Sequence, residues 1–290
     1  MLKIGKITPI YKKGNKEYLE NNRPISTLPI FGKIFEKIIY KRLYNFFTSQ
    51  NILSEQQFGF RKGHSTSHAL NYSIDKIKEA HKSKKHVIGV FIDLSKAFDT
   101  IDHKIMLQKL YNCGIRGIAY DLLSSYLTNR TQYTNIFGED SEKESVLYGV
   151  PQGSVLGPLL FLLYINDIIN CCKNNKINFK IILYADDTNI FVIGENRKEA
   201  TEKANEILDA ISKYMSSNLL HINMDKCCYM HFAPSSKRNH EKFTSTADND
   251  NEDIINITIN NHNIKEVTQT RYLGIVLDNK LTWTTYSLSS

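Results

Sequence analysis

The sequence contains few cysteines, and none of them form the paired spacing typical of metal ligands. Its 290 residues include five cysteines: Cys113 and two vicinal pairs, Cys171–Cys172 and Cys227–Cys228. An odd count at these spacings is unlike the disulfide framework of a small secreted protein. Because no C-x-x-C pair occurs, a zinc site is not indicated. We therefore expect an intracellular protein, in the cytoplasm or the nucleus, where thiols stay reduced.

Long hydrophobic segments are also missing. Residues 1–6 lack the apolar core of a signal peptide. The most apolar run, Val155–Ile165, is far shorter than the roughly 20 residues that a membrane span requires, so it predicts a buried helix and no membrane association. With 41% hydrophobic residues and no internal repeat, the chain has the composition of one large or two small globular domains, which excludes collagen-like and wholly disordered proteins.

The charge balance is moderately basic. Lysine and arginine number 37 and aspartate and glutamate 30, a net charge of +7. This excess suits a partner that carries phosphates, but a merely soluble basic surface explains it equally well.

Helices and strands alternate along most of the chain. Apolar spacing and turn residues predict helices at 30–47, 102–113, 117–127, 158–170 and 197–215. Short β-branched or alternating runs predict strands at 87–92, 132–137, 181–184, 189–193, 220–224, 228–232, 254–259 and 272–277. The polar segment 234–256 predicts a flexible loop between two strands. This mixture is typical of an α+β fold with a mostly antiparallel sheet.

Three aspartates are the first candidate site. Asp93 follows a hydrophobic strand, and Asp186 and Asp187 lie in the turn 185–188 of a predicted β-hairpin. Neighbouring carboxylates repel each other unless a cation neutralises them, and oxygen-rich sites favour Mg²⁺. Three such carboxylates can hold two ions for in-line phosphoryl transfer. The alternative is that the two adjacent aspartates simply make a polar turn.

The loop 149–158 is the second candidate. It contains two prolines and three glycines, and leads into a helix, a composition that suits a rigid loop whose backbone closely approaches a ligand. Gln152 can both donate and accept hydrogen bonds to a sugar or a base edge. An ordinary helix-entry loop is the alternative.

These three segments, with four others in the expected order, resemble the polymerase core of non-LTR retrotransposon reverse transcriptases, most closely the jockey-like elements. The resemblance extends from about Ile7 to Trp283. It rests on Arg23-Pro24-Ile25-Ser26, Gln57-Phe58-Gly59-Phe60-Arg61, Phe91-Ile92-Asp93 through Phe98-Asp99, Gly149 to Phe161, Tyr184-Ala185-Asp186-Asp187, Leu220-His221-Ile222-Asn223 with Lys226, and Arg271-Tyr272-Leu273-Gly274. Each motif alone is weak evidence, whereas seven in order make chance similarity an inadequate explanation.

The resemblance implies roles for the acidic site. Asp93 and Asp186 would bind two Mg²⁺ ions, with Mn²⁺ as a possible substitute, and Asp187 would be the third carboxylate. Lys226 would be the general acid that protonates pyrophosphate, the alternative being a surface lysine that closes a turn.

It also implies substrate-binding residues. Phe98 would exclude a 2′-hydroxyl and so select dNTPs, the alternative being core packing. Lys12 and Arg23 would clamp the triphosphate, and Arg61 would contact the template or the triphosphate. Gln152 would lie in the template and nucleotide loop.

The implied fold is a right-hand polymerase, with fingers at 1–86 interleaved with a palm at 87–290, and without a thumb or an endonuclease, as in a truncated copy. The implied reaction is RNA-directed DNA synthesis, which adds dNTPs to a DNA primer on an RNA template. Two alternatives stay open: an RNA-dependent RNA polymerase, against which the aromatic Phe98 argues, and a non-catalytic nucleic-acid-binding remnant of a retrotransposon polymerase.

Overall fold

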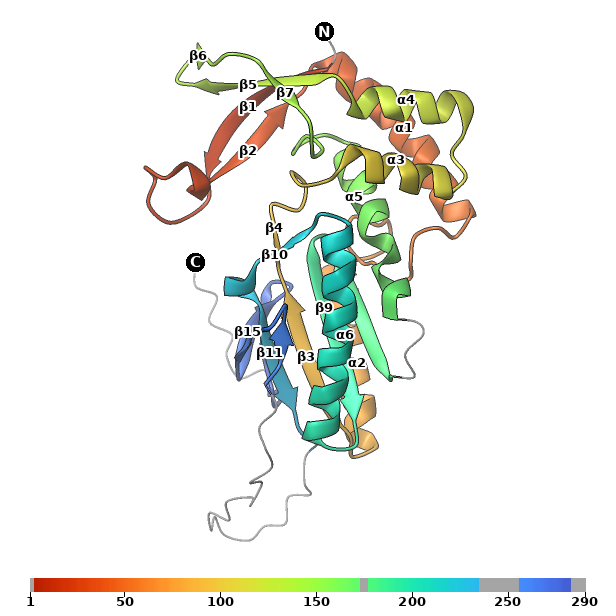
Figure 1. Cartoon of the computed structure of the whole chain (residues 1–290), viewed down its shortest axis with the longest axis vertical. Coiled ribbons are helices and arrows are strands. Elements are labelled where there is room, and N and C mark those ends of the chain that lie inside the picture. The colour runs from red at the N-terminus through yellow and green to blue at the C-terminus, as the bar shows by residue number, and fades with distance from the viewer. Residues whose placement is uncertain (1–2, 173–176, 235–255, 283–290) are drawn as a thin grey trace. The chain divides into compact units, whose positions relative to one another are not determined.

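The computed structural model describes residues 3–172, 177–234 and 256–282. The chain forms two compact units that interleave along the sequence. Unit 1 comprises Met1–Phe60, Ser95–Asp167 and Met215–His221, and unit 2 comprises Arg61–Leu94, Ile168–Tyr214 and Ile222–Ser290. Each unit has its own sheet and its own helices (Figure 1).

Unit 1 is built on a five-stranded sheet. Its strands are β1 (Ile4–Tyr11), β2 (Asn22–Thr27), β5 (Arg130–Ile136), β6 (Glu139–Asp140) and β7 (Glu144–Val146). β1 pairs antiparallel with β2 and parallel with β5, and β6 and β7 pair antiparallel with β5. A short 3₁₀ helix, η1 (Leu19–Asn21), precedes β2. The sequence pattern did not predict β1 and β2, because lysine, arginine and proline residues interrupt the alternation of apolar and polar side chains in these strands.

Four helices accompany this sheet: α1 (Ile30–Ser49), α3 (His103–Asn112), α4 (Gly117–Leu127) and α5 (Gly157–Ile165). The predicted helices at 30–47, 102–113 and 117–127 are confirmed. The side chain of Asp102 caps α3 by accepting a hydrogen bond from Ile105 N–H at 2.8 Å. Gly114, with φ at +96°, follows the end of α3, because glycine adopts this left-handed conformation without steric cost.

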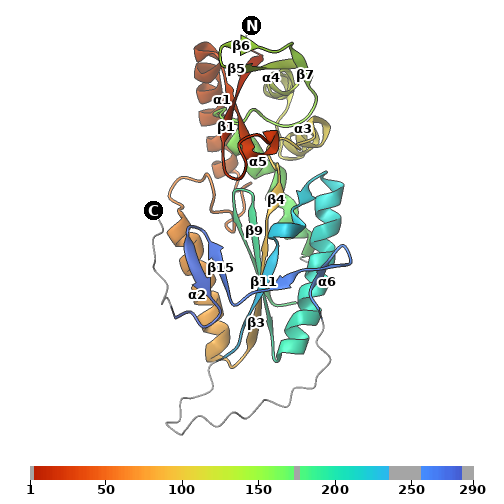
Figure 2. The same cartoon turned by 90° about the vertical axis from the view of Figure 1, so that its left-hand side faces the viewer.

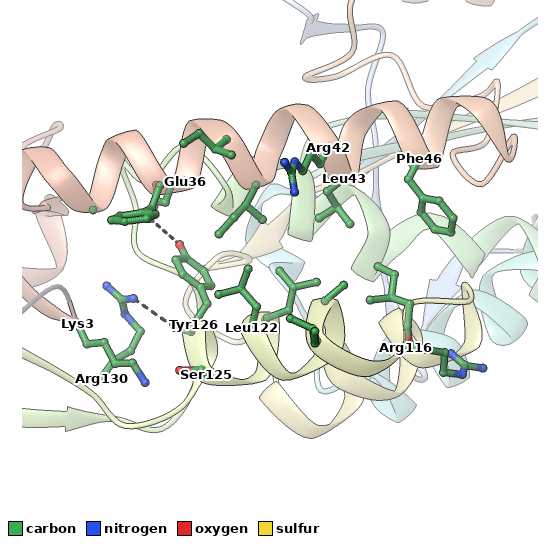
Figure 3. Close-up of a pocket in the computed structure, with 18 of the residues that line it drawn as sticks. Lys3, Glu36, Arg42, Leu43, Phe46, Arg116, Leu122, Ser125, Tyr126 and Arg130 are labelled. Atoms are coloured by element: carbon green, nitrogen blue, oxygen red, sulfur yellow. Dashed lines mark hydrogen bonds between the residues drawn. The ribbon is translucent and has the colours of Figure 1, made fainter.

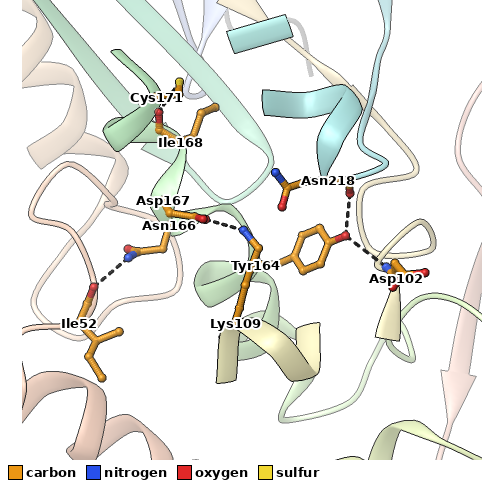
Figure 4. A network of polar contacts seen from close by, with 9 residues as sticks. All are labelled: Ile52, Asp102, Lys109, Tyr164, Asn166, Asp167, Ile168, Cys171 and Asn218. Carbon is orange, nitrogen blue, oxygen red and sulfur yellow. Dashed lines mark hydrogen bonds and ion pairs between the residues drawn. The ribbon is translucent and has the colours of Figure 1, made fainter. Parts of the chain in front are cut away.

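The predicted helix 158–170 is wrong in its second half. The α-helix α5 ends at Ile165, and the chain continues as the 3₁₀ helix η2 (Asn166–Cys172). The side chains of Asn166 and Asp167 are committed to tertiary contacts: Asn166 donates to Ile52 C=O at 2.8 Å, and Asp167 pairs with Lys109 at 2.5 Å (Figure 4). Apolar periodicity carries no information about such contacts.

The core of unit 1 surrounds α5. All of its residues except Pro158 are buried, and Tyr164 is completely so. The Tyr164 hydroxyl donates to Asn218 C=O at 2.6 Å and accepts from Asp102 N–H at 3.3 Å (Figure 4). These bonds connect α5, the start of α3 and the segment after α6, all within unit 1.

Unit 2 is built on a second sheet, with strand order β14-β11-β3-β9-β8. Its strands are β3 (His86–Ile92), β8 (Phe179–Tyr184), β9 (Asp187–Gly194), β11 (Cys228–Phe232) and β14 (Lys265–Glu266). All pairings are antiparallel except that between β11 and β14. Every residue of β3 after His86 is buried, which confirms the predicted interior strand at 87–92. The predictions at 181–184, 189–193 and 228–232 are also confirmed.

Two long helices run along this sheet, α2 (Thr66–Lys82) and α6 (Arg197–Ser217) (Figure 2). The helix predicted at 197–215 is α6, whereas α2 was not predicted. A hairpin of β12 (Thr258–Ile259) and β13 (His262–Asn263) contacts α6, where Asn205 Oδ1 accepts from Thr258 N–H at 3.0 Å.

The predicted strand 272–277 is wrong, because it is a hairpin. β15 (Gln269–Tyr272) and β16 (Ile275–Asp278) pair antiparallel across a turn at Leu273 and Gly274, both with positive φ. The Tyr272 hydroxyl shares a 2.8 Å hydrogen bond with Ser73 on α2, which fixes this hairpin to the helix.

The remaining described elements are short. They are β4 (Leu94–Ser95), β10 (His221–Ile222) and the 3₁₀ helix η3 (Met224–Lys226). The strand predicted at 220–224 is therefore shorter than expected. Of the strand predicted at 254–259, Thr258–Ile259 is a strand, while residues 254–255 and almost all of the predicted loop 234–256 lie outside the described residues.

The prediction of an α+β fold with mostly antiparallel sheets is confirmed. In the part of the chain that the structure describes, no helix is both long and apolar enough to cross a membrane.

Candidate active site

The turn between β8 and β9 positions two of the predicted aspartates. Tyr184 pairs with Asp187, so the connecting turn consists of Ala185 and Asp186. Asp187 is the first residue of β9, two residues earlier than the sequence predicted. Ala185 adopts a positive φ of 56°, a conformation that tight hairpin turns require. Asp186 therefore lies at the tip, and Asp187 follows it on the strand.

Asp93 lies at the same end of the sheet. β3 and β9 are antiparallel, with Ile92 opposite Thr188, so the next step along each strand leads to Asp93 and to Asp187. The peptide N–H of Asn223 donates to Asp93 C=O at 2.9 Å, which ties the turn that follows β10 to the end of β3.

Lys226 comes from that turn. Its ammonium donates to Asp93 Oδ2 at 2.6 Å. All four predicted residues of the acidic site, Asp93, Asp186, Asp187 and Lys226, therefore gather at one end of the unit 2 sheet, although Lys226 is separated from Asp93 by 133 positions.

The electrostatics reflect this crowding. The pKa of Asp187 is raised to about 6, first because the protein partly withdraws the carboxyl from water, and then because Asp186 and Asp93 repel its negative charge. The nearby Lys226 acts in the opposite direction. The residue as a whole is exposed, so a cation from solvent can reach it.

The donor set fits a hard divalent cation. Three carboxylates from adjacent strands supply only oxygen ligands, which suit Mg²⁺ or Mn²⁺. Among the described residues, no group of three histidine, cysteine or acidic side chains is placed so that it could hold a metal ion. In this conformation the Asp93 carboxylate pairs with Lys226 instead.

The predicted loop in unit 1 is held by backbone contacts. Gly149 N–H donates to Ile101 C=O at 2.7 Å, and Val150 N–H to Phe98 C=O at 2.9 Å. A Cβ on Gly149, where φ is +83°, would lie 2.8 Å from the backbone of Asp99. The glycine is therefore required by a close approach of two chain segments.

This approach brings Gln152 to Asp99. The Gln152 side-chain NH₂ donates to both carboxylate oxygens of Asp99, at 2.9 and 2.8 Å. Burial raises the pKa of Asp99, and the bond from Gln152 opposes that shift. Both side chains line a cavity of about 300 Å³ that Ser26 and Tyr148 also border.

Phe98 is fixed by other aromatic rings. Its ring centroid lies 4.8 Å from that of Phe161 on α5, and 6.3 Å from that of Phe60 in an edge-to-face arrangement. Phe98 is half-buried, so part of the ring faces solvent.

The predicted basic residues are divided between the units. Lys12 and Arg23 are exposed and lie at the loop end of the β1–β2 hairpin, where Ile10 pairs with Arg23 and Lys12 N–H donates to Asn21 C=O at 2.8 Å. Arg61 is half-buried and begins unit 2.

Two acidic residues escaped the sequence prediction. Asp99 is the last residue of one of the sequence motifs, but no role was predicted for it. Its position directly after Phe98 could have indicated that it lies near the site. Glu36 is buried, and accepts from Tyr126 O–H at 2.9 Å and from Val155 N–H at 2.6 Å. A glutamate among the apolar positions of the predicted helix 30–47 could have indicated a buried contact.

Comparison with known proteins identifies the class. Residues 10–277 match the family described as reverse transcriptase (RNA-dependent DNA polymerase). Because this match covers most of the chain, the protein belongs to the reverse transcriptase family.

Its relatives define the branch. The chain is 30% identical, over 97% of its length, to the RNA-directed DNA polymerase from mobile element jockey of Drosophila melanogaster. It is 31% identical, over 97% of its length, to the probable RNA-directed DNA polymerase from transposon X-element of the same species. In both cases the chain spans 29% of the relative's own length. The expected kinship with jockey-like non-LTR retrotransposon enzymes is thus confirmed.

Solved structures support the fold. Apo telomerase from Candida tropicalis, truncated from its C-terminal domain, aligns with a TM-score of 0.61 over 97% of this chain and 54% of that one, at 12% identity. Full apo telomerase from the same species aligns with a TM-score of 0.59. These likenesses confirm the expected fingers and palm architecture of a reverse transcriptase.

Proposed function

We propose that this chain carries out RNA-directed DNA synthesis, adding dNTPs to the 3′ end of a DNA primer on an RNA template. The observation that carries the proposal is the meeting of Asp93, Asp186 and Asp187 at one end of the unit 2 sheet. Carboxylates placed this close repel one another and lower the stability of the fold. The same carboxylates can bind the metal ions that assist phosphoryl transfer.

Asp93 and Asp186 would hold two Mg²⁺ ions, with Asp187 as the third carboxylate. When bound, the ions would lower the pKa of the primer 3′-hydroxyl and stabilise negative charge on the α-phosphate and the departing pyrophosphate. Asp93 pairs with Lys226 in this structure, so this pair would have to open for Asp93 to hold an ion. The Lys226 ammonium would then be able to donate a proton to the pyrophosphate oxygen.

The residues of unit 1 would select and orient the nucleotide. The Phe98 ring, held by Phe161 and Phe60, would exclude a ribose 2′-hydroxyl. Gln152 would hydrogen-bond the nucleotide or the template. Lys12 and Arg23 would bind the triphosphate, Arg23 with the two-pronged geometry of a guanidinium. We assign Arg61 to the template or the triphosphate. The number and spacing of the cysteines support an intracellular setting, where thiols stay reduced.

Primer extension tests the proposed reaction. With Mg²⁺, dNTPs and an RNA template, Asp186→Asn should lower the rate at least about 10³-fold, because a ligand carboxylate is lost. Asp209→Asn is the matched control: it removes the same charge from an exposed position on α6 and should leave the rate unchanged. Equal background from wild type and Asp186→Asn, with RNA binding retained, would instead identify a non-catalytic nucleic-acid-binding remnant.

A second experiment tests sugar selection. Phe98→Ala should increase the use of rNTPs relative to dNTPs by about 10-fold or more, because space opens beneath the sugar. Phe137→Ala removes a fully exposed ring in a surface turn and should leave the ratio unchanged. No gain of rNTP use in Phe98→Ala would refute the assignment and restore the core-packing interpretation.

A further inference from the structure

Unit 1 has a second, larger cavity, which is lined by α1 and α4. It has a volume of about 1000 Å³ and opens between the two helices (Figure 3). Its walls are almost entirely hydrocarbon, from Phe35, Ile38, Ile39, Leu43 and Phe46 on one side and Ile115, Ile118, Ala119, Leu122 and Leu123 on the other. We call this cavity the α1–α4 groove.

The groove exposes large apolar side chains to solvent. Ile118 is 88% exposed, Ile38 51% and Leu122 49%. Scattered exposed apolar residues are common, but a contiguous apolar surface at a concave site marks a place where another molecule binds.

The margin of the groove carries three cations that reach solvent, Lys3, Arg42 and Arg116. A fourth cation of the lining, Arg130, is buried and bonds to the carbonyl oxygen of Tyr126. Arg116 and Lys3 bond to the carbonyl oxygens of Tyr111 and Thr128. Within the described ranges, none of the four pairs with an acidic side chain.

Glu36 is the one acidic residue among those that line the groove, so the cations of the lining outnumber it. Its carboxylate is buried and already accepts hydrogen bonds from Tyr126 and Val155 (Figure 3 shows the bond to Tyr126). The groove therefore combines an apolar floor with an unbalanced positive margin.

We propose that the α1–α4 groove binds an amphipathic helix of a partner protein, with an apolar face toward the floor and acidic side chains along its flanks. A helix satisfies its own backbone hydrogen bonds, so it can enter a carbon-lined groove without leaving polar groups unpaired. A groove between two packed helices accepts a third through side chains spaced i, i+3, i+4 and i+7. The acidic flanks would pair with Arg42, Arg116 and Lys3.

The charges argue against two other occupants. A second copy that docked through the same groove would bring like cations together, which costs affinity. A nucleic acid would pair with the arginines but would leave the apolar floor uncovered. The proposal goes beyond the polymerase reaction and does not rest on it.

Peptide binding tests the proposal. The probe is a fluorescein-labelled helical peptide with leucines at i, i+3, i+4 and i+7 and glutamates on both flanks, titrated with the full chain and followed by anisotropy. A companion peptide has the same leucines and lysine flanks. We expect the glutamate-flanked peptide to bind at least about tenfold more tightly than the lysine-flanked one.

Two pairs of variants locate the site. Arg42→Glu should weaken binding of the glutamate-flanked peptide about tenfold or more and strengthen that of the lysine-flanked peptide. Lys41→Glu, one residue away on α1 but not in the lining, should change neither. Ile118→Ser should weaken both peptides, whereas Leu19→Ser, an exposed apolar residue of unit 1 outside the groove, should weaken neither.

Other outcomes overturn the proposal. Equal affinity for both peptides would mean that the charged margin has no role. A concentration-dependent dimer that Ile118→Ser abolishes would assign the groove to a second copy. An RNA oligonucleotide that displaces the peptide and loses affinity in Arg42→Glu but not in Lys41→Glu would assign it to nucleic acid.

Discussion

At the scale of single residues, the repulsion between the carboxylates of the acidic site lowers the stability of the folded chain. Three carboxylates converge at one end of the unit 2 sheet, where Lys226 pairs with Asp93. The sequence predicted the convergence, because hydrophobic strands preceded both Asp93 and Asp186. It could not predict that Lys226 pairs with Asp93, since 133 positions separate them and no local pattern links them.

Replacing Asp187 should therefore stabilise the metal-free chain. A carboxyl whose pKa is raised in the native state costs stability above its unfolded pKa, so the native state loses stability as pH rises through about 6. Asp187→Asn should raise the melting temperature at pH 7 in EDTA by about 1–3 °C, since solvent screens the repulsion. The difference should shrink toward pH 5. A lower melting temperature than wild type at pH 7 would contradict the prediction.

Asp99 is predicted to be a positioning residue that acts through Gln152. Its carboxylate accepts both bonds from the Gln152 amide, so it fixes the direction in which the amide oxygen points. Asp99→Ala should raise KM for dNTPs about 5–20-fold with a smaller effect on kcat, the loss expected for one or two hydrogen bonds to a charged group.

A double-mutant cycle separates this role from a structural one. In a Gln152→Ala background, Asp99→Ala should have no further effect on KM, because the amide that Asp99 orients is already absent. Additive effects of the two substitutions would show that Asp99 supports the fold instead.

At the scale of elements, apolar periodicity located most helices and strands but not where they end. The run 272–277 satisfies a strand pattern, yet Leu273 and Gly274 turn the chain back on itself. The end of α5 depends on Asn166 and Asp167, whose partners Ile52 and Lys109 lie far away in sequence. Element types follow from local pattern, whereas boundaries follow from tertiary contacts.

The hydroxyl of Tyr164, on α5, is predicted to contribute measurably to the stability of unit 1. Tyr164→Phe removes the hydroxyl that joins Asp102 N–H and Asn218 C=O and leaves these groups without that partner. The free energy of unfolding in urea should fall by about 1–3 kcal/mol. Tyr18→Phe, at an exposed position, should change it by less than about 0.5 kcal/mol. An equal loss in both variants would refute the assigned role.

The pairing of β3 with β11 predicts sensitivity to acid. His231 and His86 stack and share a 2.9 Å hydrogen bond. The pKa of His231 is lowered to about 4, first by burial and then by the charges of Arg197 and His86. In the unfolded chain this histidine takes up its proton near pH 6.5, so native stability falls as pH drops from about 6.5 to about 4.

Chemical denaturation between pH 7 and pH 4 measures this effect. Because the ring is only part-buried, the contribution of His231 should be on the order of 1–2 kcal/mol. His231→Phe should flatten the pH profile, while His262→Asn, at an exposed position of β13, should leave it unchanged. An unaltered profile in His231→Phe would exclude the histidine pair as its origin.

At the scale of the whole molecule, the sequence predicted the family, the fold class and fingers that interleave with a palm, but not which segments make up each compact unit. The bounds 1–86 for the fingers and 87–290 for the palm stay a prediction. A compact unit is defined by which segments pack together, and strand pairings as distant in sequence as that of β1 with β5 are invisible to local periodicity.

The net charge of +7 makes its own prediction for nucleic-acid binding. If exposed lysines and arginines follow the phosphate backbone, binding releases condensed counterions, and the affinity falls linearly with salt on logarithmic axes. Affinity for an RNA–DNA primer-template should drop at least about tenfold between 50 and 200 mM salt. Arg61→Ala, at a residue that we assign to the template or the triphosphate, should lower affinity similarly for unrelated sequences and reduce the slope by about one. A flat salt dependence would show that the basic excess is ordinary surface charge, because no counterions are then exchanged when the nucleic acid binds.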